Sequence, residues 1–177
     1  MKLHQLVSEI DKESYSHKVP IMTMLKVFVT FFGVGLSPKA PGTMGTAAAI
    51  PFALLLIWSG PFIHMFAAMA LALAAIVACE KYEKQIGGHD HSHIVIDEVV
   101  GFLITMTWLP ITWQSVLAGF VLFRLFDIWK PWPIRHFDKK VAGGLGVVVD
   151  DIVAGIFANI ILQLLYTKTN LLGVQIL

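Results

Sequence analysis

The sequence has a single cysteine and few charged residues. With Cys79 alone among 177 residues, the chain can form no intramolecular disulfide, no thiolate metal cluster and no CxxC redox pair. Only 14% of the residues are charged, whereas 56% are hydrophobic and the mean hydropathy is +0.74. A soluble domain with this composition would expose large apolar patches and aggregate, so the composition indicates a membrane protein.

The charge pattern gives no sign of a nucleic-acid partner. The formal net charge is +1, and the basic residues form no continuous stripe. The first twenty residues, MKLHQLVSEIDKESYSHKVP, lack the apolar core and the small-residue cleavage site of a secretory signal. We expect residues 1–20 to form a polar cytoplasmic segment and residues 21–177 to form a single membrane-embedded domain.

Five apolar segments, each bounded by polar residues, Pro or Gly, predict membrane-spanning helices. They cover about residues 43–58, 61–79, 94–109, 113–129 and 147–166. Residues 21–36 are also apolar but include Lys26, so the pattern leaves open whether this segment spans, re-enters or lies in the interface. The expected fold is an all-α polytopic bundle of about four to six transmembrane or re-entrant helices.

Basic residues fall on alternate connections between these predicted helices, which sets the topology. Those near the predicted ends are Lys39, Lys81, Lys84, Lys130, Arg135, Lys139 and Lys140. The remaining connections, residues 59–60 and 110–112, carry no charge. Because connections rich in lysine and arginine stay on the cytoplasmic side, the connections that contain these basic residues are expected in the cytoplasm.

On this topology five carboxylates lie at one membrane depth. Asp97 and Glu98 begin the third predicted span, Asp127 ends the fourth, and Asp150 and Asp151 begin the fifth. Four of them could simply cap helix N-termini, but Asp127 lies at a C-terminus, where the helix dipole disfavours negative charge. Acids at a membrane edge are costly and indicate function, so we predict that the five form one site.

A glycine follows each acidic pair by about one helical turn. Gly101 follows Asp97 and Glu98, and Gly155 follows Asp150 and Asp151. Because small residues let helices in membranes approach closely, the two acidic helices are expected to pack against each other.

Five carboxylates packed together would repel one another unless cations joined them. A ligand set made only of oxygen favours Mg²⁺ over zinc, and Mg²⁺ usually keeps positions for water and phosphate oxygens. Arg124 and Lys130 lie on the same helical face as Asp127 and could bind such a phosphate. The alternative is an Arg124–Asp127 ion pair with Lys130 extending toward the membrane surface.

The turn GLSPKAPGTMGT, residues 35–46, is a second candidate for anion binding. Lys39 projects from it, and Thr43 is expected to cap the following helix, whose first N–H groups could receive phosphate. It is not a Walker A motif, because the order GxxxxGK[ST] is absent. The alternative is an ordinary capping turn whose lysine contacts lipid headgroups.

The loop GGHDHSH, residues 87–93, is rich in metal-ligand side chains, namely His89, Asp90, His91 and His93. Alternating spacing in a loop lacks the fixed geometry of a helical HExxH motif. We interpret it as a polar loop leading to the acidic site, with a zinc site as the alternative.

Four blocks together carry a resemblance to a known family. In order, SPKAPGTMGT, HDHSHIVIDEVVGF, FRLFDIWKPWPIRHFD and GGLGVVVDDIVAG resemble the signature blocks of the phosphatidylglycerophosphatase A family, from about Gly33 to Gly155. Thr46 stands where many members have serine, which keeps the hydroxyl.

This resemblance implies a Mg²⁺-dependent phosphatase of the bacterial inner membrane, with its active site on the cytoplasmic face. Its substrate would be phosphatidylglycerophosphate, which it would convert to phosphatidylglycerol and inorganic phosphate. By motif, Asp97, Glu98, Asp127, Asp150 and Asp151 would form the metal and catalytic centre. The residues that would hold the phosphate are Lys39, Thr43, Thr46, Arg124 and Lys130.

Several alternatives stay open at this point. No Cys-x₅-Arg loop is present, so the nucleophile would be water or an aspartate, with water preferred. Two other classes compete with the enzyme: a small transporter with an acidic relay, and a non-catalytic subunit that binds anionic lipid. The oligomeric state is not indicated by the sequence.

Overall fold

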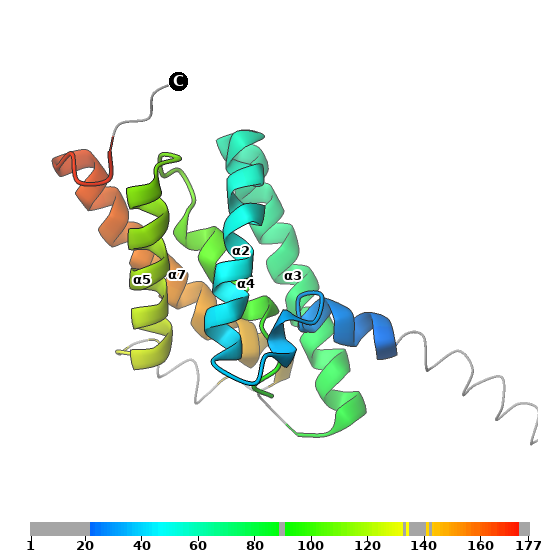
Figure 1. Ribbon diagram of the computed structural model, residues 1–177. Coiled ribbons are helices and arrows are strands. Elements are labelled where there is room, and N and C mark those ends of the chain that lie inside the picture. Colours follow the sequence, from blue (N-terminus) through cyan, green and yellow to red (C-terminus); the bar gives the residue numbers. More distant parts are fainter. Residues whose placement is uncertain (1–21, 89–90, 133, 135–140, 142, 174–177) are drawn as a thin grey trace, which may run out of the picture.

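The computed structural model describes residues 22–88, 91–132, 134, 141 and 143–173, and within them it contains helices and no strand. The elements are η1 (Val34–Leu36), α2 (Pro41–Trp58), α3 (Pro61–Ile86), α4 (Ile96–Thr105), α5 (Trp113–Trp129) and α7 (Gly143–Lys168). Figure 1 shows α2, α3 and α5 running along one direction, with α7 crossing them obliquely and α4 between them. The predicted all-α fold is confirmed.

Three helices, α2, α3 and α7, are long and apolar enough to cross a membrane. In α3 the large side chains face outward and the small ones inward: Phe66 and Leu73 are exposed, whereas Ala68, Ala72 and Ala75 are buried. A helix in water would be arranged the other way round, but in lipid the small residues form the helix contacts. The protein is therefore a helical membrane protein.

The third predicted span, residues 94–109, is not a complete spanning helix. α4 has 10 residues, about 15 Å at 1.5 Å per residue, which is half of the hydrocarbon core. After Thr105 the chain leaves the helix, Trp108 adopts a left-handed conformation with φ 58°, and Pro110 follows. An apolar run alone does not distinguish a helix from buried irregular chain, which is why the prediction was wrong in length.

Polar side chains of α7 satisfy the carbonyl groups at the C-terminal end of α4. The amide nitrogen of Asn159 donates to the carbonyl oxygens of Thr105 and Thr107, at 2.8 Å each. Gln163 donates to the carbonyls of Thr107 at 3.0 Å and Trp108 at 3.2 Å. Irregular backbone inside a membrane needs such partners, so α7 makes the half-length helix possible.

The predicted close contact between the two acidic helices is confirmed. A β-carbon on Gly155 would lie 2.4 Å from the carbonyl oxygen of Gly101, and one on Gly101 would lie 2.8 Å from the carbonyl oxygen of Asp151. Both distances are too short for any larger residue, so the two glycines set the spacing of α4 and α7.

Two helices extend beyond their predicted bounds toward the acidic residues. α3 continues to Ile86, so Lys81 and Lys84 lie on its last turns and not in a loop. α7 begins at Gly143, where the N–H of Gly144 donates to Oε2 of Glu80 on α3 at 2.7 Å. Asp150 and Asp151 are therefore two turns inside α7, and the view that they merely cap its first turn is excluded.

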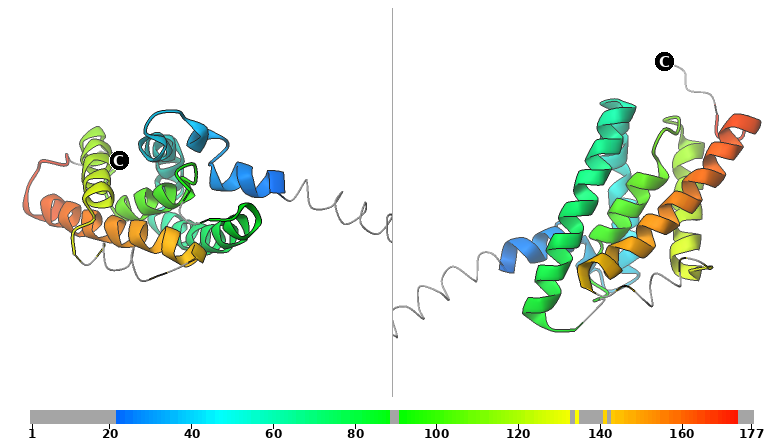
Figure 2. Two further views of the ribbon diagram at one scale, coloured as in Figure 1. Left: turned by 90° about the horizontal axis from the view of Figure 1, so that it is seen from below. Right: turned by 180° about the vertical axis from the view of Figure 1, so that it is seen from behind.

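The segment that the sequence left undecided does not span the bundle in its described part. Residues 22–29 are helical, about 12 Å long, and run across the direction of α3 in the right view of Figure 2. Val29 is buried, and its carbonyl oxygen accepts from the N–H of Val95 at 2.9 Å. This helix therefore docks beside the start of α4. Residues 1–20 lie outside the described residues.

Candidate active site

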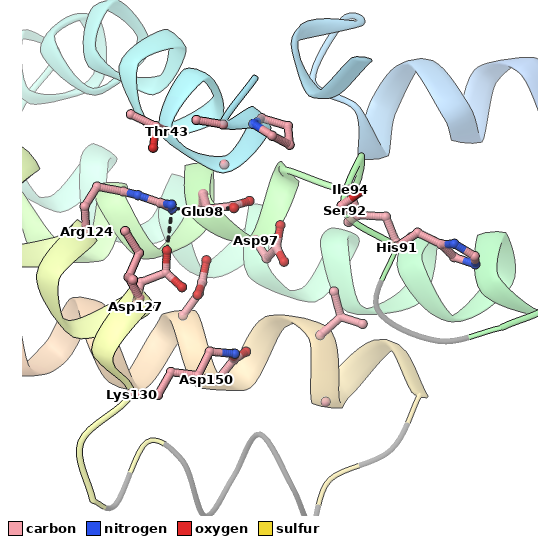
Figure 3. Close-up of a pocket in the computed structure, with 17 residues that line it drawn as sticks. Thr43, His91, Ser92, Ile94, Asp97, Glu98, Arg124, Asp127, Lys130 and Asp150 are labelled. Carbon is pink, nitrogen blue, oxygen red and sulfur yellow. Dashed lines mark hydrogen bonds and ion pairs between the residues drawn. The ribbon is translucent and has the colours of Figure 1, made fainter. Parts of the chain in front are cut away.

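A cavity of about 530 Å³ lies at the end of the bundle where α2, α4 and α7 begin and α5 ends, which we call the acidic end. All five predicted carboxylates line it: Asp97, Glu98, Asp127, Asp150 and Asp151. Figure 3 shows the side chains of Asp97, Glu98, Asp127 and Asp150 converging from α4, α5 and α7. Residues more than fifty positions apart in the sequence thus share one site, as the topology predicted.

Three of the carboxylates form a tight group. Oxygen atoms of Asp97, Glu98 and Asp151 all lie within 4.8 Å of one another, and we call these residues the carboxylate trio. Asp97 and Asp151 are only 9% and 3% exposed. One buried oxygen of each member has no hydrogen-bond partner in the structure, namely Oδ1 of Asp97, Oε2 of Glu98 and Oδ2 of Asp151. Buried carboxylate oxygens that face one another without a hydrogen-bond partner have the chemistry to hold a cation.

Two basic residues are paired with the other two acids. The guanidinium of Arg124 contacts Asp127 and lies 3.5 Å from Oε1 of Glu98. Nζ of Lys130 donates to Oδ2 of Asp150 at 2.6 Å. The Arg124–Asp127 pair of the alternative interpretation is present, but Lys130 points into the cavity and does not extend along the surface. Arg124 thus also approaches one member of the trio, and among the described residues Asp97 and Asp151 are the acids of the site without an ion-pair partner.

The C-terminal end of α5 directs Lys130 inward. α5 ends at Trp129, and Lys130 adopts a left-handed conformation with φ 44° before Pro131. Pro131 cannot continue an α-helix, which is consistent with α5 ending before it. Because the backbone turns at Lys130 itself, its side chain leaves the helix surface and reaches α7.

The start of α2 differs from the prediction. The helix begins at Pro41, with Ala40 in a left-handed conformation before it and no side-chain cap. Proline suits the first helical position because its missing N–H needs no partner there. Thr43 therefore lies inside the first turn, and the prediction that it caps α2 is wrong. It nevertheless lines the cavity.

The structure does not bring Lys39 and Thr46 to the cavity lining. Thr46 is fully buried, and its hydroxyl donates to the carbonyl oxygen of Gly42 at 2.9 Å. Lys39 is exposed, beside the lining residue Ala40. Thr46 lies about one helical turn further along α2 than Thr43, beyond the cavity lining, and its hydroxyl is used within the helix.

Gly42 is part of the site that the sequence reasoning did not identify. A β-carbon there would lie 2.0 Å from Oε1 of Glu98 and 3.0 Å from Nη1 of Arg124. The glycine lets the first turn of α2 lie directly against this charged pair. The PGT turn signalled a bend in the chain but not which residues the glycine faces.

The described part of the histidine loop borders the cavity. His91 and Ser92 line it, and the ring of His91 donates through Nε2 to the carbonyl oxygen of Gly87 at 2.8 Å. Nε2 of His93 and the hydroxyl of Tyr82 share a hydrogen bond of 2.9 Å. Burial, together with the nearby charges of His91 and Lys26, lowers the pKa of His93.

Within the described ranges, the carboxylate trio is the one group of side chains that converges like a metal site. His89 and Asp90, which belong to the zinc alternative, lie outside the described residues.

Comparison with known proteins agrees with the motifs. The model of the family described as phosphatidylglycerophosphatase A matches residues 27–166. The phosphatidylglycerophosphatase A of Escherichia coli K12 is 48% identical over 128 residues, covering 72% of this chain and 74% of the relative. The phosphatidylglycerophosphatase A of Haemophilus influenzae is 40% identical over 146 residues, covering 81% of this chain and 90% of the relative.

A further relative bears a different lipid in its name. A protein of Bacteroides thetaiotaomicron, provisionally named a phosphatidylinositol-3-phosphatase, is 36% identical over 146 residues, covering 75% of this chain and 87% of the relative. No solved structure matches the chain significantly.

Proposed function

The chain belongs to the phosphatidylglycerophosphatase A family and is a phosphatase, and we propose that it hydrolyses the terminal phosphate monoester of phosphatidylglycerophosphate. The products are phosphatidylglycerol and inorganic phosphate, which makes the reaction a step of phospholipid biosynthesis. The observation that carries this proposal is the cavity at the acidic end, where the carboxylate trio lies beside Arg124 and Lys130. Such a site suits a phosphate held between a divalent cation and basic side chains.

The residues present fit Mg²⁺. The trio offers three buried oxygens without a hydrogen-bond partner, and all are hard carboxylate ligands. Asp127 and Asp150 are paired with Arg124 and Lys130, which makes the trio the best candidate for direct ligation. When bound there, Mg²⁺ would neutralise negative charge on the phosphate and lower the pKa of a water molecule.

The chain's own residues bind and orient the phosphate. Arg124 and Lys130 are fixed by their carboxylate partners, so their remaining N–H groups can donate to phosphate oxygens with little loss of side-chain freedom. A water oxygen then attacks phosphorus in line while the ester P–O bond breaks. One carboxylate of the trio takes the proton of the water, and this proton passes to the departing oxygen of phosphatidylglycerol.

The acidic end lies on the cytoplasmic side in this proposal. Lys81, Lys84 and Lys130 lie at that end, on the last turns of α3 or just after α5. At the opposite end, residues 59–60 and 106–112 contain no charged residue, and the last turn of α7 has Lys168 as its basic residue. The positive-inside rule therefore favours a bacterial inner-membrane enzyme whose site faces the cytoplasm.

Two other functions are less well supported. A transporter with an acidic relay needs ionisable groups along the membrane, but after Glu98 in α4 and after Asp151 in α7 the helices contain no further acid. A lipid-binding subunit without activity would not need the buried trio.

The test is phosphate release from phosphatidylglycerophosphate in detergent micelles. We expect release by the purified protein, loss in EDTA and recovery on adding Mg²⁺. Asp97→Asn should lower the rate by about 10²-fold or more, because it removes a trio oxygen. Equal activity on phosphatidylinositol-3-phosphate would widen the substrate class, and no release under any metal condition would overturn the proposal. A phospho-enzyme labile to hydroxylamine would replace water by an aspartate as nucleophile.

A further inference from the structure

A second cavity of about 540 Å³ lies between α2 and α5. Its walls are apolar: Ala47, Ile50 and Leu54 come from α2, and Val116, Leu117 and Phe120 come from α5. Leu117 is 54% exposed, so the cavity is a groove that opens on the lipid-facing surface. We call it the α2–α5 groove.

The groove continues from the acidic cavity along the same two helices. On α2, Thr43 lines the acidic cavity and Ala47 lines the groove; on α5 the corresponding residues are Arg124 and Phe120. Each pair is separated by four residues, about one helical turn or 6 Å. In Figure 1, α2 and α5 run beside each other from the acidic end toward the opposite end. The charged cavity and the apolar groove therefore follow each other along one line.

This order matches the order of chemical groups in a phospholipid. The groove extends from Ala47 to Leu54 on α2, about 10 Å along the helix axis, and leads away from the membrane surface. A lipid whose phosphate monoester lies in the acidic cavity has its hydrocarbon chains on this side. We propose that the α2–α5 groove binds one acyl chain of the lipid substrate, which enters sideways from the bilayer. This inference rests on the proposed function, because the phosphate position fixes where the chain begins.

Filling the groove tests the inference kinetically. Ala47→Phe places a ring in the groove, whereas Ala74→Phe makes the same change on the exposed face of α3. Two substrates are compared: long-chain phosphatidylglycerophosphate and its deacylated, water-soluble headgroup. Ala47→Phe should lower kcat/KM for the long-chain lipid about tenfold more than for the headgroup, mainly through KM. Ala74→Phe should change neither value. Equal losses on the two substrates would overturn the inference.

Photolabelling tests it without turnover. The probe is a methylenephosphonate analogue of phosphatidylglycerophosphate, which cannot be hydrolysed, with a diazirine in one acyl chain. On wild-type protein we expect labelled residues within 47–54 and 113–120, and competition by unlabelled phosphatidylglycerophosphate but not by phosphatidylethanolamine. Equal competition by both lipids would mean that the groove holds bulk bilayer lipid, and labelling confined to α3 and α7 would exclude the groove. Both results contradict the inference.

The two proposals can fail separately. If the probe labels the groove specifically but no phosphate is released, the acyl-chain site stands and the phosphatase substrate is wrong. If phosphate is released but the probe does not label the groove specifically and Ala47→Phe affects both substrates equally, the proposed function stands and the acyl-chain site is wrong.

Discussion

Gly42 of α2 lies against Glu98 of α4 so closely that a β-carbon on the glycine would be 2.0 Å from Oε1 of the carboxylate. The same β-carbon would lie 3.0 Å from Nη1 of Arg124. The first turn of α2 therefore forms a wall of the acidic cavity, and its fit depends on a residue without a side chain. The contact joins the proline-glycine turn to the acidic site, which are far apart in the sequence.

Gly42→Ala should impair catalysis more than folding. The atoms that the new methyl group meets are the ends of flexible side chains, so Glu98 and Arg124 can move at little cost in stability. Their displacement misplaces the charges that face the phosphate, and a shift of about 1 Å can cost about 10²-fold in rate. We expect kcat/KM to fall by about that factor, measured by phosphate release, with little change in Tm.

Gly45→Ala is the matched control for this prediction. Its β-carbon would lie 2.7 Å from Cβ of Val95 and 3.3 Å from the Val95 carbonyl oxygen, neither of which can move without the backbone. Overpacking of this kind costs about 1–3 kcal/mol, so Tm should fall. Full activity of Gly42→Ala, or a loss of Tm as large as that of Gly45→Ala, would contradict the assignment of Gly42 to the site wall.

Asp151→Asn should change stability in opposite directions with and without metal. In EDTA the trio holds unbalanced charge, so removing one carboxylate should raise Tm by roughly 2–4 °C, equivalent to about 1 kcal/mol for a chain of this size. With Mg²⁺ at about 100 times its Kd, the wild type gains about 2.7 kcal/mol and the variant should gain far less. Thermal unfolding with a Mg²⁺ titration measures both.

Asp127→Asn provides the comparison, because Asp127 is paired with Arg124 and lies outside the trio. Its Mg²⁺-dependent gain in Tm should stay close to that of the wild type. If Asp127→Asn abolishes this gain and Asp151→Asn keeps it, the metal is held by a different set of acids.

Asn159→Leu should destabilise the protein through α4. The side chain of Asn159 donates to the carbonyl oxygens of Thr105 and Thr107, and leucine leaves that of Thr105 without its side-chain donor inside the membrane, while that of Thr107 keeps Gln163. Each unsatisfied buried carbonyl costs about 1–3 kcal/mol, so Tm in detergent should fall markedly. Gln163→Leu should cost less, because the bonds of Gln163 are longer and one is exposed. An equal or larger loss for Gln163→Leu would contradict this ranking.

The sequence predicted the membrane class, the helix order and the convergence of five acids, because hydropathy and the distribution of lysines constrain each of them. It did not predict that α4 stops halfway, since that depends on Asn159 and Gln163, which are more than fifty residues away. Nor did it show that Gly42 faces Glu98, because a glycine in a turn gives no sign of its neighbour. The motif blocks indicated the five acids, Arg124 and Lys130, but they also included Lys39 and Thr46, which lie outside the cavity lining, and they gave no pairings.

The pairing of Lys130 with Asp150 separates two lysines that the sequence treated alike. Lys130 lines the cavity, whereas Lys39 is exposed outside the lining. Lys130→Met should lower kcat/KM by about 10²-fold, as expected for loss of a preorganised charge near a phosphate. Lys39→Met should stay within about threefold of the wild type, because exposed charges contribute little. Phosphate release measured at several ionic strengths checks both values.

Folding must be separated from catalysis in this comparison, because Lys130→Met leaves the buried Asp150 without its lysine, and breaking a buried pair can cost about 3–5 kcal/mol. The double variant Lys130→Met/Asp150→Asn removes both charges and should regain Tm without regaining activity. Lys130→Arg keeps the charge and should lie between wild type and Lys130→Met in kcat/KM. If Lys39→Met loses as much activity as Lys130→Met, both lysines bind the phosphate, as the motif alone suggested.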